Sequence, residues 1–168
     1  MLVGPLIFVG RVCLLSHLLE KILFMENIVY DDLKVGQSAS QSATLTHKAI
    51  HDFAEVTGDF NPAHLNPDYA RTTIMKDVVG HGMWSGALFS RILGTQFPGP
   101  GTIYLGQTLK FRRPVYVNDV ITATVTVTRK DDAKGMVWLD TVVKNQNGET
   151  VIEGEATILA PKTKFSSA

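Results

Sequence analysis

One segment constrains the fold of this chain more than any other. Residues 82–96 (GMWSGALFSRILGTQ) carry apolar side chains around most of a helical circumference. A helix with that pattern is surrounded by protein instead of being half exposed to water. Long segments with alternating apolar residues follow it, and they must cover this helix because little else in the chain can bury so much apolar surface. The sequence therefore predicts the α+β class, with an antiparallel sheet curled around a central apolar helix.

The hydrophobic period changes to two after residues 98–101, which is typical of half-buried strands. Asn147-Gly148 joins the last two alternating segments, and this dipeptide is the strongest short-range signal for a hairpin. We expect an antiparallel meander, in which Tyr104 and Phe111 are core residues. Strands are expected over residues 103–111, 121–128, 136–146 and 149–159.

Two further helices are predicted before the core helix. A threonine cap and a C-terminal glycine flank residues 47–57, which indicates a helix there. An Asn-Pro pair opens a short helix at about residues 67–72, with asparagine as the cap and proline in the first turn. Residues 58–65 are expected to form the loop between these helices.

Composition limits the class of protein. The 168 residues fit one domain, which we place at residues 25–161, with residues 162–168 as a C-terminal tail. Sixteen basic and sixteen acidic residues give no net charge, so nothing attracts the chain to nucleic acid or to an anionic membrane. The single cysteine, Cys13, excludes an intramolecular disulfide and a cysteine-based zinc site. We expect a cytoplasmic protein.

Residues 1–24 differ from the rest because they are strongly apolar, with no acidic residue before Glu20. A secretory signal would place its charge before the apolar run, whereas Arg11 follows it. A membrane span needs about 18 or more apolar residues without charges, and charged residues interrupt this run. An organellar presequence has little support from one arginine and one serine. We expect a non-core extension, able to dock as an amphipathic helix, and Met25 as an alternative start.

The loop at residues 58–65 holds the residues suited to chemistry. Asp59 and His64 stand five positions apart, and Asn61-Pro62 stiffens the chain between them. A carboxylate and an imidazole on one rigid turn can hold a water, one taking its proton while the other protonates a substrate. The alternative is structural: Asp59 caps a turn and His64 bonds a carbonyl group.

A second element stands at the start of the core helix. There, backbone N–H groups lack partners and the helix dipole is positive, so the end of the helix can stabilise an oxyanion. Gly82 has no Cβ and allows a ligand to approach the backbone. His81, taken alone, is expected to orient the loop.

Three segments resemble the MaoC-like (R)-specific enoyl-CoA hydratases of the hotdog fold. They are GDFNPAHLNPDYA at 58–70, GHGMWSGALFSRILG at 80–94 and IYLGQTLKFRRPVYVND at 103–119. The resemblance implies reversible syn-addition of water to trans-2-enoyl thioesters, which gives (R)-3-hydroxyacyl thioesters. It implies no metal and no redox cofactor. The substrate would be an acyl-CoA or an acyl carrier protein thioester, and the protein a homodimer or a higher homo-oligomer.

Positions within these motifs carry the family's roles over to this chain. Asp59 and His64 resemble the catalytic pair, and Gly82 resembles the residue whose N–H binds the thioester oxygen. Ser90 resembles the polar residue near the site, and Leu93 a position in the acyl pocket. Departures from the family pattern include Asn66, Asn118, Gly80 and Trp84. Trp84 and Arg91 lie on the helix expected to line the acyl pocket, so the resemblance does not define the length of the acyl chain.

Lys110, Arg112 and Arg113 form the only dense basic cluster in the sequence. They are candidates for binding the phosphates of CoA. The alternative is a charged strand edge that prevents pairing with other chains.

Two rival functions stay open at this point. A hotdog thioesterase would direct the water at the thioester carbonyl, and product analysis separates it from a hydratase. Because a fold does not guarantee chemistry, the second rival is a non-catalytic protein that binds acyl thioesters. Such a protein would still bind its ligand after loss of Asp59.

Overall fold

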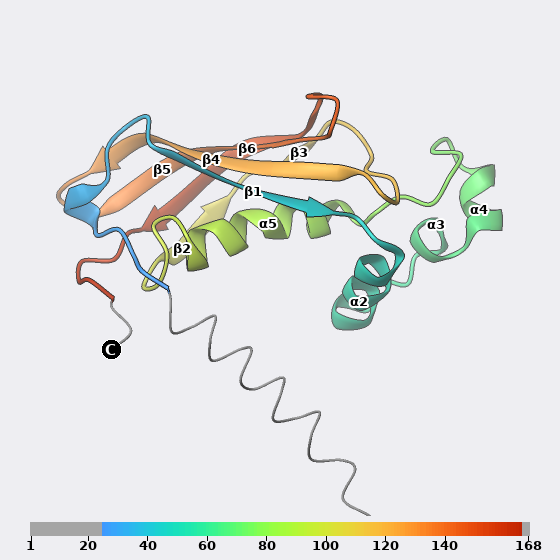
Figure 1. Ribbon diagram of the computed structural model, residues 1–168, viewed down its shortest axis with the longest axis horizontal. Coiled ribbons are helices and arrows are strands. Elements are labelled where there is room, and N and C mark those ends of the chain that lie inside the picture. The colour runs from blue at the N-terminus through green and yellow to red at the C-terminus, as the bar shows by residue number, and fades with distance from the viewer. Residues whose placement is uncertain (1–24, 166–168) are drawn as a thin grey trace, which may run out of the picture.

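The computed structural model describes residues 25–165, which form one curved sheet with a long helix lying across it (Figure 1). The strands run in the order β1-β4-β5-β6-β2, β3 also pairs with β6, and every pair is antiparallel. The predicted α+β class is confirmed. The strands are β1 (Ser38–Thr44), β2 (Ile103–Gln107), β3 (Lys110–Phe111), β4 (Val120–Asp131), β5 (Met136–Lys144) and β6 (Thr150–Leu159).

Helix α5 (Gly82–Thr95) packs against β1, β2, β4 and β5, so the predicted core helix is confirmed. Phe89, Ile92 and Leu93 are buried against the sheet. Met83 and Ala87, on the other side of the helix, are exposed. The expectation that protein surrounds the helix is therefore wrong for a single chain, because the sheet covers only one side.

The meander β4-β5-β6 follows the predicted alternation. On β4, the apolar residues at 121, 123, 125 and 127 are buried, while the threonines at 122, 124 and 126 are half-buried. Gly148 has φ 79° in the turn that joins β5 to β6, a conformation that glycine adopts without strain. The predicted hairpin is confirmed.

Strand β1 has no counterpart among the predicted strands. Its sequence, SASQSAT, contains only small or polar residues, and it covers one edge of the sheet. The opposite edge differs from expectation in another way. Tyr104 on β2 is partly exposed, and Phe111 on β3 is 53% exposed, so the expectation that both are core residues is wrong. The alternation in residues 103–111 reflects an apolar edge instead of a buried face.

Helices α2 (His47–Thr57) and α4 (Pro67–Thr72) occupy the predicted ranges. The predicted loop between them contains a further short helix, α3 (Pro62–Leu65). The Asn61 side chain accepts a hydrogen bond from the Ala63 N–H, and Pro62 fits the first turn, which explains why the chain coils here. Figure 1 shows α2, α3 and α4 together beyond one end of α5.

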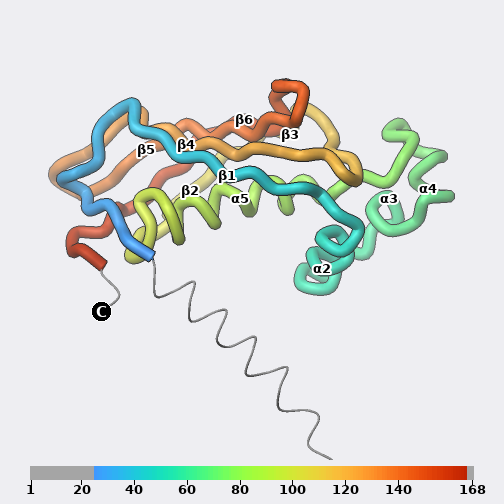
Figure 2. Tube along the Cα trace, in the orientation of Figure 1, coloured from blue at the N-terminus to red at the C-terminus, as the bar shows by residue number. Residues whose placement is uncertain are grey.

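The two ends of the described chain lie side by side (Figure 2). The Asn27 side-chain amide donates to the Thr163 carbonyl at 2.9 Å and accepts from the Phe165 N–H at 2.8 Å. The first residues of the predicted tail therefore pack onto the domain. Within residues 25–165, no helix combines the length and the apolar character needed to cross a bilayer. The predictions for residues 1–24 lie outside the described residues.

Candidate active site

Asp59 comes directly after helix α2. Gly58 ends that helix in the left-handed conformation, with φ 75°, and so allows the chain to turn sharply. An Asp59 carboxylate oxygen accepts a hydrogen bond from the Asn61 N–H at 3.3 Å, which holds the side chain against its own loop. The side chain is 52% exposed. The carboxylate is thus held in place and still open to water.

His64 lies on α3 and is anchored through one ring nitrogen. Its Nδ1 lies 2.7 Å from the carbonyl oxygen of Val79. A carbonyl oxygen can only accept, so Nδ1 carries the proton and donates it. Nε2 is therefore the nitrogen of His64 that is left to exchange a proton with another molecule.

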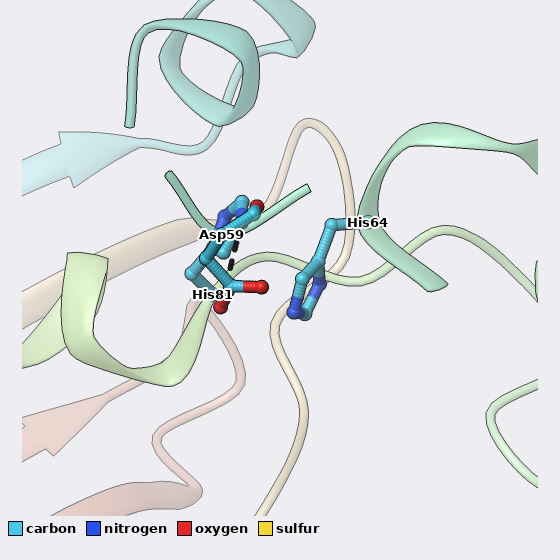
Figure 3. Close-up of side chains that lie close together, drawn as sticks. All are labelled: Asp59, His64 and His81. Carbon is cyan, nitrogen blue, oxygen red and sulfur yellow. Dashed lines mark hydrogen bonds and ion pairs between the residues drawn. The ribbon is translucent and has the colours of Figure 1, made fainter. Parts of the chain in front are cut away.

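Asp59, His64 and His81 form a compact cluster (Figure 3). A carboxylate oxygen of Asp59 and one ring nitrogen from each histidine all lie within 4.8 Å of one another. One water that bonds two such atoms spans about 4.5 Å between them, given hydrogen bonds of about 2.8 Å. The predicted pairing of Asp59 with His64 around a water is therefore geometrically possible.

Gly82 is the first residue of α5. The preceding residue, His81, does not cap the helix with its side chain. The first N–H groups of a helix lack partners within it and lie at the positive end of its dipole. The N-terminus of α5 can therefore stabilise a negatively charged oxygen, as predicted from the sequence.

His64 and Gly82 both line a cavity of about 300 Å³. We call it the site cavity. The rest of its lining is mainly apolar, which suits an acyl group more than a polar metabolite. The remaining lining residues are Met75, Val79, Gly80, Ser85, Phe111, Arg112, Arg113, Pro114, Val115, Val151 and Ile152.

Comparison with known proteins identifies the family. The family described as MaoC like domain matches residues 32–150, which is well over half of the chain. The chain belongs to the MaoC-like family. An (R)-specific enoyl-CoA hydratase of Rhodospirillum rubrum is 48% identical to this MaoC-like protein over 132 residues, covering 79% of this chain and 91% of the relative. One of Aeromonas caviae is 43% identical over 129 residues, covering 77% and 96%.

A solved structure shows the same fold. The R-hydratase PhaJ1 from Pseudomonas aeruginosa, in its unliganded form, superposes on this MaoC-like protein with a TM-score of 0.80 at 46% sequence identity. The alignment covers 84% of this chain and 90% of that one. The predicted hotdog fold of the family is confirmed.

Four predicted site residues of this MaoC-like protein do not line the site cavity: Asp59, Ser90, Leu93 and Lys110. Asp59 nevertheless lies beside His64, which does line it. Leu93 is 1% exposed and belongs to the hydrophobic core. Ser90 faces outward and lines a separate apolar groove with Phe53, Met83 and Tyr104. Ser85, which was not among the predicted site residues, is buried and lines the site cavity. Its position three residues after Gly82 could have identified it, because residues three apart share a helix face.

The predicted phosphate-binding cluster is divided. Arg112 forms an ion pair with Glu153, and Arg113 forms one with Glu149 at 3.2 Å. The hydrogen bond from Arg112 lowers the pKa of the Glu153 carboxyl below its usual value. Both arginines border the site cavity, whereas Lys110 lines a different hollow on the sheet. The charges of Arg112 and Arg113 are already balanced by Glu153 and Glu149.

Proposed function

We propose that this protein is an (R)-specific enoyl-CoA hydratase that adds water reversibly to trans-2-enoyl-CoA thioesters. One observation carries the proposal: the Asp59 carboxylate and the His64 ring come within bridging distance of one water, next to a cavity that also contains the N-terminus of α5. The identity of 43–48% with relatives named (R)-specific enoyl-CoA hydratases supports it.

In the proposed mechanism, the thioester oxygen accepts a hydrogen bond from the Gly82 N–H. This bond draws electron density from C3 and stabilises the enolate-like charge that forms as water attacks. Asp59 and His64 hold the attacking water. One of them takes its proton and the other protonates C2 on the same face, so the addition is syn.

The hydrogen bond to Val79 defines which atom of His64 takes part. Since Nδ1 donates to that carbonyl, Nε2 is the atom at which His64 takes a proton from the water or gives one to C2. The same bond fixes the plane of the ring, and a fixed ring is what a proton transfer to one face of C2 requires. Val79 contributes through its backbone, so the identity of its side chain has no part in this step.

CoA is the carrier that we propose, since both of the relatives described above are named for CoA substrates. Arg112 and Arg113, at the rim of the site cavity, are the groups placed to meet the phosphates of CoA. Each would have to release or share its carboxylate partner to do so. Lys110 is proposed as a more distant contact. The proposed roles of Ser90 and Leu93 rest on the family resemblance alone, because in this chain Ser90 lines another groove and Leu93 is buried in the core.

We propose further that the protein works as a homodimer in the cytoplasm. Met83 on α5 and Tyr104 on β2 are exposed apolar residues that line the groove containing Ser90, and Ile103 and Leu105 on β2 are exposed as well. Strand β2 is also an unpaired edge of the sheet. A second copy that covers this face would bury the exposed side of α5, and two-fold pairing is the commonest form of assembly.

The proposal is tested with crotonyl-CoA, whose conjugated thioester absorbance falls on hydration. Asp59→Asn and His64→Gln should each lower kcat by on the order of 10²-fold or more, since each removes a positioned acid or base. Asp68→Asn and His51→Gln make the same changes at exposed positions on α4 and α2, and they should leave kcat unchanged. A parallel thiol assay detects hydrolysis: release of free CoA by the wild type, without hydration, would identify a thioesterase instead.

A further inference from the structure

His81 has contacts that the proposed reaction does not yet use. It is the residue before α5, and its side chain is 3% exposed. It does not line the site cavity, although its neighbours Gly80 and Gly82 both do. The His81 ring is buried, whereas the Asp59 carboxylate is half exposed, so solvent reaches Asp59 and not His81.

The first contact is with the loop that carries Asp59. Nε2 of His81 lies 3.0 Å from the backbone carbonyl oxygen of Asp59 and 4.0 Å from one of its carboxylate oxygens. Since the carbonyl only accepts, Nε2 carries a proton and donates it. This bond crosses 22 positions in sequence, and it ties the loop after α2 to the start of α5.

The second contact is with the ring of His64. The two imidazole centroids are 3.9 Å apart, with an angle of 37° between the ring planes. Phe53 on α2 packs against His81 as well, with centroids 5.0 Å apart. His81 therefore has a fixed position of its own and supports the face of the His64 ring.

The third contact is through the backbone. His81 is the N-cap residue of α5, with an extended conformation of φ −61° and ψ 128°, and the next N–H is that of Gly82. A movement of the His81 ring would therefore carry the oxyanion donor with it. One side chain thus connects Asp59, His64 and Gly82, which belong to three different segments of the chain.

The protonation of His81 suits this position. Its Nδ1 is buried and has no hydrogen-bond partner among the described residues. The proton on Nε2 is therefore the one that forms the hydrogen bond to Asp59.

We propose that His81 is a positioning residue, which sets the distance between the Asp59 carboxylate, the His64 ring and the Gly82 N–H. This inference rests on the proposed hydratase function. It acts through those three groups, and His81 itself touches neither water nor substrate. A misplacement of about 1 Å in such a site can cost on the order of 10²-fold in rate.

Two substitutions separate the contacts of His81. His81→Gln keeps an N–H that can reach the Asp59 carbonyl but removes the ring, whereas His81→Phe keeps a ring against His64 but removes the donor. We expect His81→Phe to lower kcat by on the order of 10²-fold with KM changed less than about twofold. His81→Gln should restore part of kcat. Phe89→Leu, a core change on the same helix, is the control: it should lower the melting temperature and leave kcat unchanged.

If the His81→Phe variant folds and has the kcat of the wild type, the proposal is overturned, since His81 would then serve stability alone. A second measurement does not depend on turnover. The ring protons of His64, assigned in NMR spectra with His64→Gln, should show a ring-current shift that His81→Gln abolishes and His81→Phe retains. If the wild type fails to hydrate enoyl-CoA but this shift is present, the proposed function fails while the positioning contact stands. Absence of the shift in the wild type refutes the positioning role.

Discussion

Replacement of Gly82 by alanine tests whether a substrate oxygen must approach the backbone at the start of α5. A Cβ at this position would lie 2.8 Å from Cε1 and 3.0 Å from Cδ1 of Phe111. The first distance is shorter than real Cβ atoms show and the second is unusually tight, so the ring must move. Phe111 is about half exposed, and its ring can turn toward solvent.

The structure predicts a small effect of this substitution on folding and a large one on activity. Alanine within a helix is favoured over glycine by roughly 0.5–1 kcal/mol, which offsets the displacement of an exposed ring. The free energy of unfolding should therefore change by less than about 1 kcal/mol. The methyl group, however, enters the site cavity beside the Gly82 N–H. Loss of one oxyanion donor lowers kcat by about 10²–10³-fold, or about 2.7–4 kcal/mol of transition-state stabilisation.

Gly94→Ala is a matched control on the same helix. A Cβ at Gly94 would meet no atom within 4 Å, so this variant makes the same change without entering the site cavity. Hydration of crotonyl-CoA and thermal unfolding are measured for both variants. Gly82→Ala with Phe111→Ala separates the two causes, because it removes the displaced ring and keeps the added methyl group. That double variant should stay inactive.

Activity of Gly82→Ala within about threefold of the wild type, with normal unfolding, would refute the reasoning. The thioester oxygen would then not bind at this N–H. Recovery of activity in the double variant would instead place the defect in the displaced Phe111 ring.

Three further predictions concern folding and assembly. A protein that starts at Met25 should keep the melting temperature and kcat/KM of the full chain, because residues 25–165 contain the whole sheet and the cluster; a large loss of both would make residues 1–24 part of the fold. Light scattering at micromolar concentration should give a dimer, and a monomer would refute the proposed covering of α5 and β2. Gly154→Ala should destabilise the protein by roughly 1–3 kcal/mol, since its Cβ would lie 1.8 Å from the Thr108 carbonyl oxygen and overpacking typically has that cost; calorimetry that shows no change would contradict the close packing of β6.

Local signals in the sequence were sufficient for the helices and the central strands. Thr46 does accept a hydrogen bond from the Ala49 N–H, and Gly58 does end α2 in the left-handed conformation. These interactions lie within a few residues of one another, so the sequence displays both partners. The alternation on β4 was equally clear, because one face of that strand is buried and the other is not.

The edges of the sheet could not be predicted in the same way. The exposure of Tyr104 and Phe111 depends on what covers β2 and β3, and no pattern within residues 103–111 records it. Strand β1 has no apolar alternation, and it is held by pairing with β4, whose partner residues lie 76 to 88 positions later. An edge of this kind is defined by its neighbours instead of by its own side chains.

The candidate site was predictable in part. Asp59 and His64 share one loop, so their proximity follows from short-range geometry, and Gly82 follows from the start of its helix. Arg112 and Arg113 follow β3, and they pair with Glu153 on β6 and with Glu149 just before it, 41 and 36 positions away. Spacing alone cannot indicate these ion pairs. The contact between His64 and His81 likewise depends on how α3 and α5 pack.

The stereochemistry of the product tests the central claim most directly. Crotonyl-CoA is incubated with the full chain in D₂O, and the 3-hydroxybutyryl-CoA formed is analysed for the configuration at C3 and for the position of deuterium at C2. The account predicts the (R)-alcohol, as for the (R)-specific relatives. It also predicts deuterium at C2 on the same face as the new hydroxyl group, because Asp59 and His64 act on one water from one side. An (S)-alcohol, deuterium on the opposite face, or release of free CoA without hydration would contradict it.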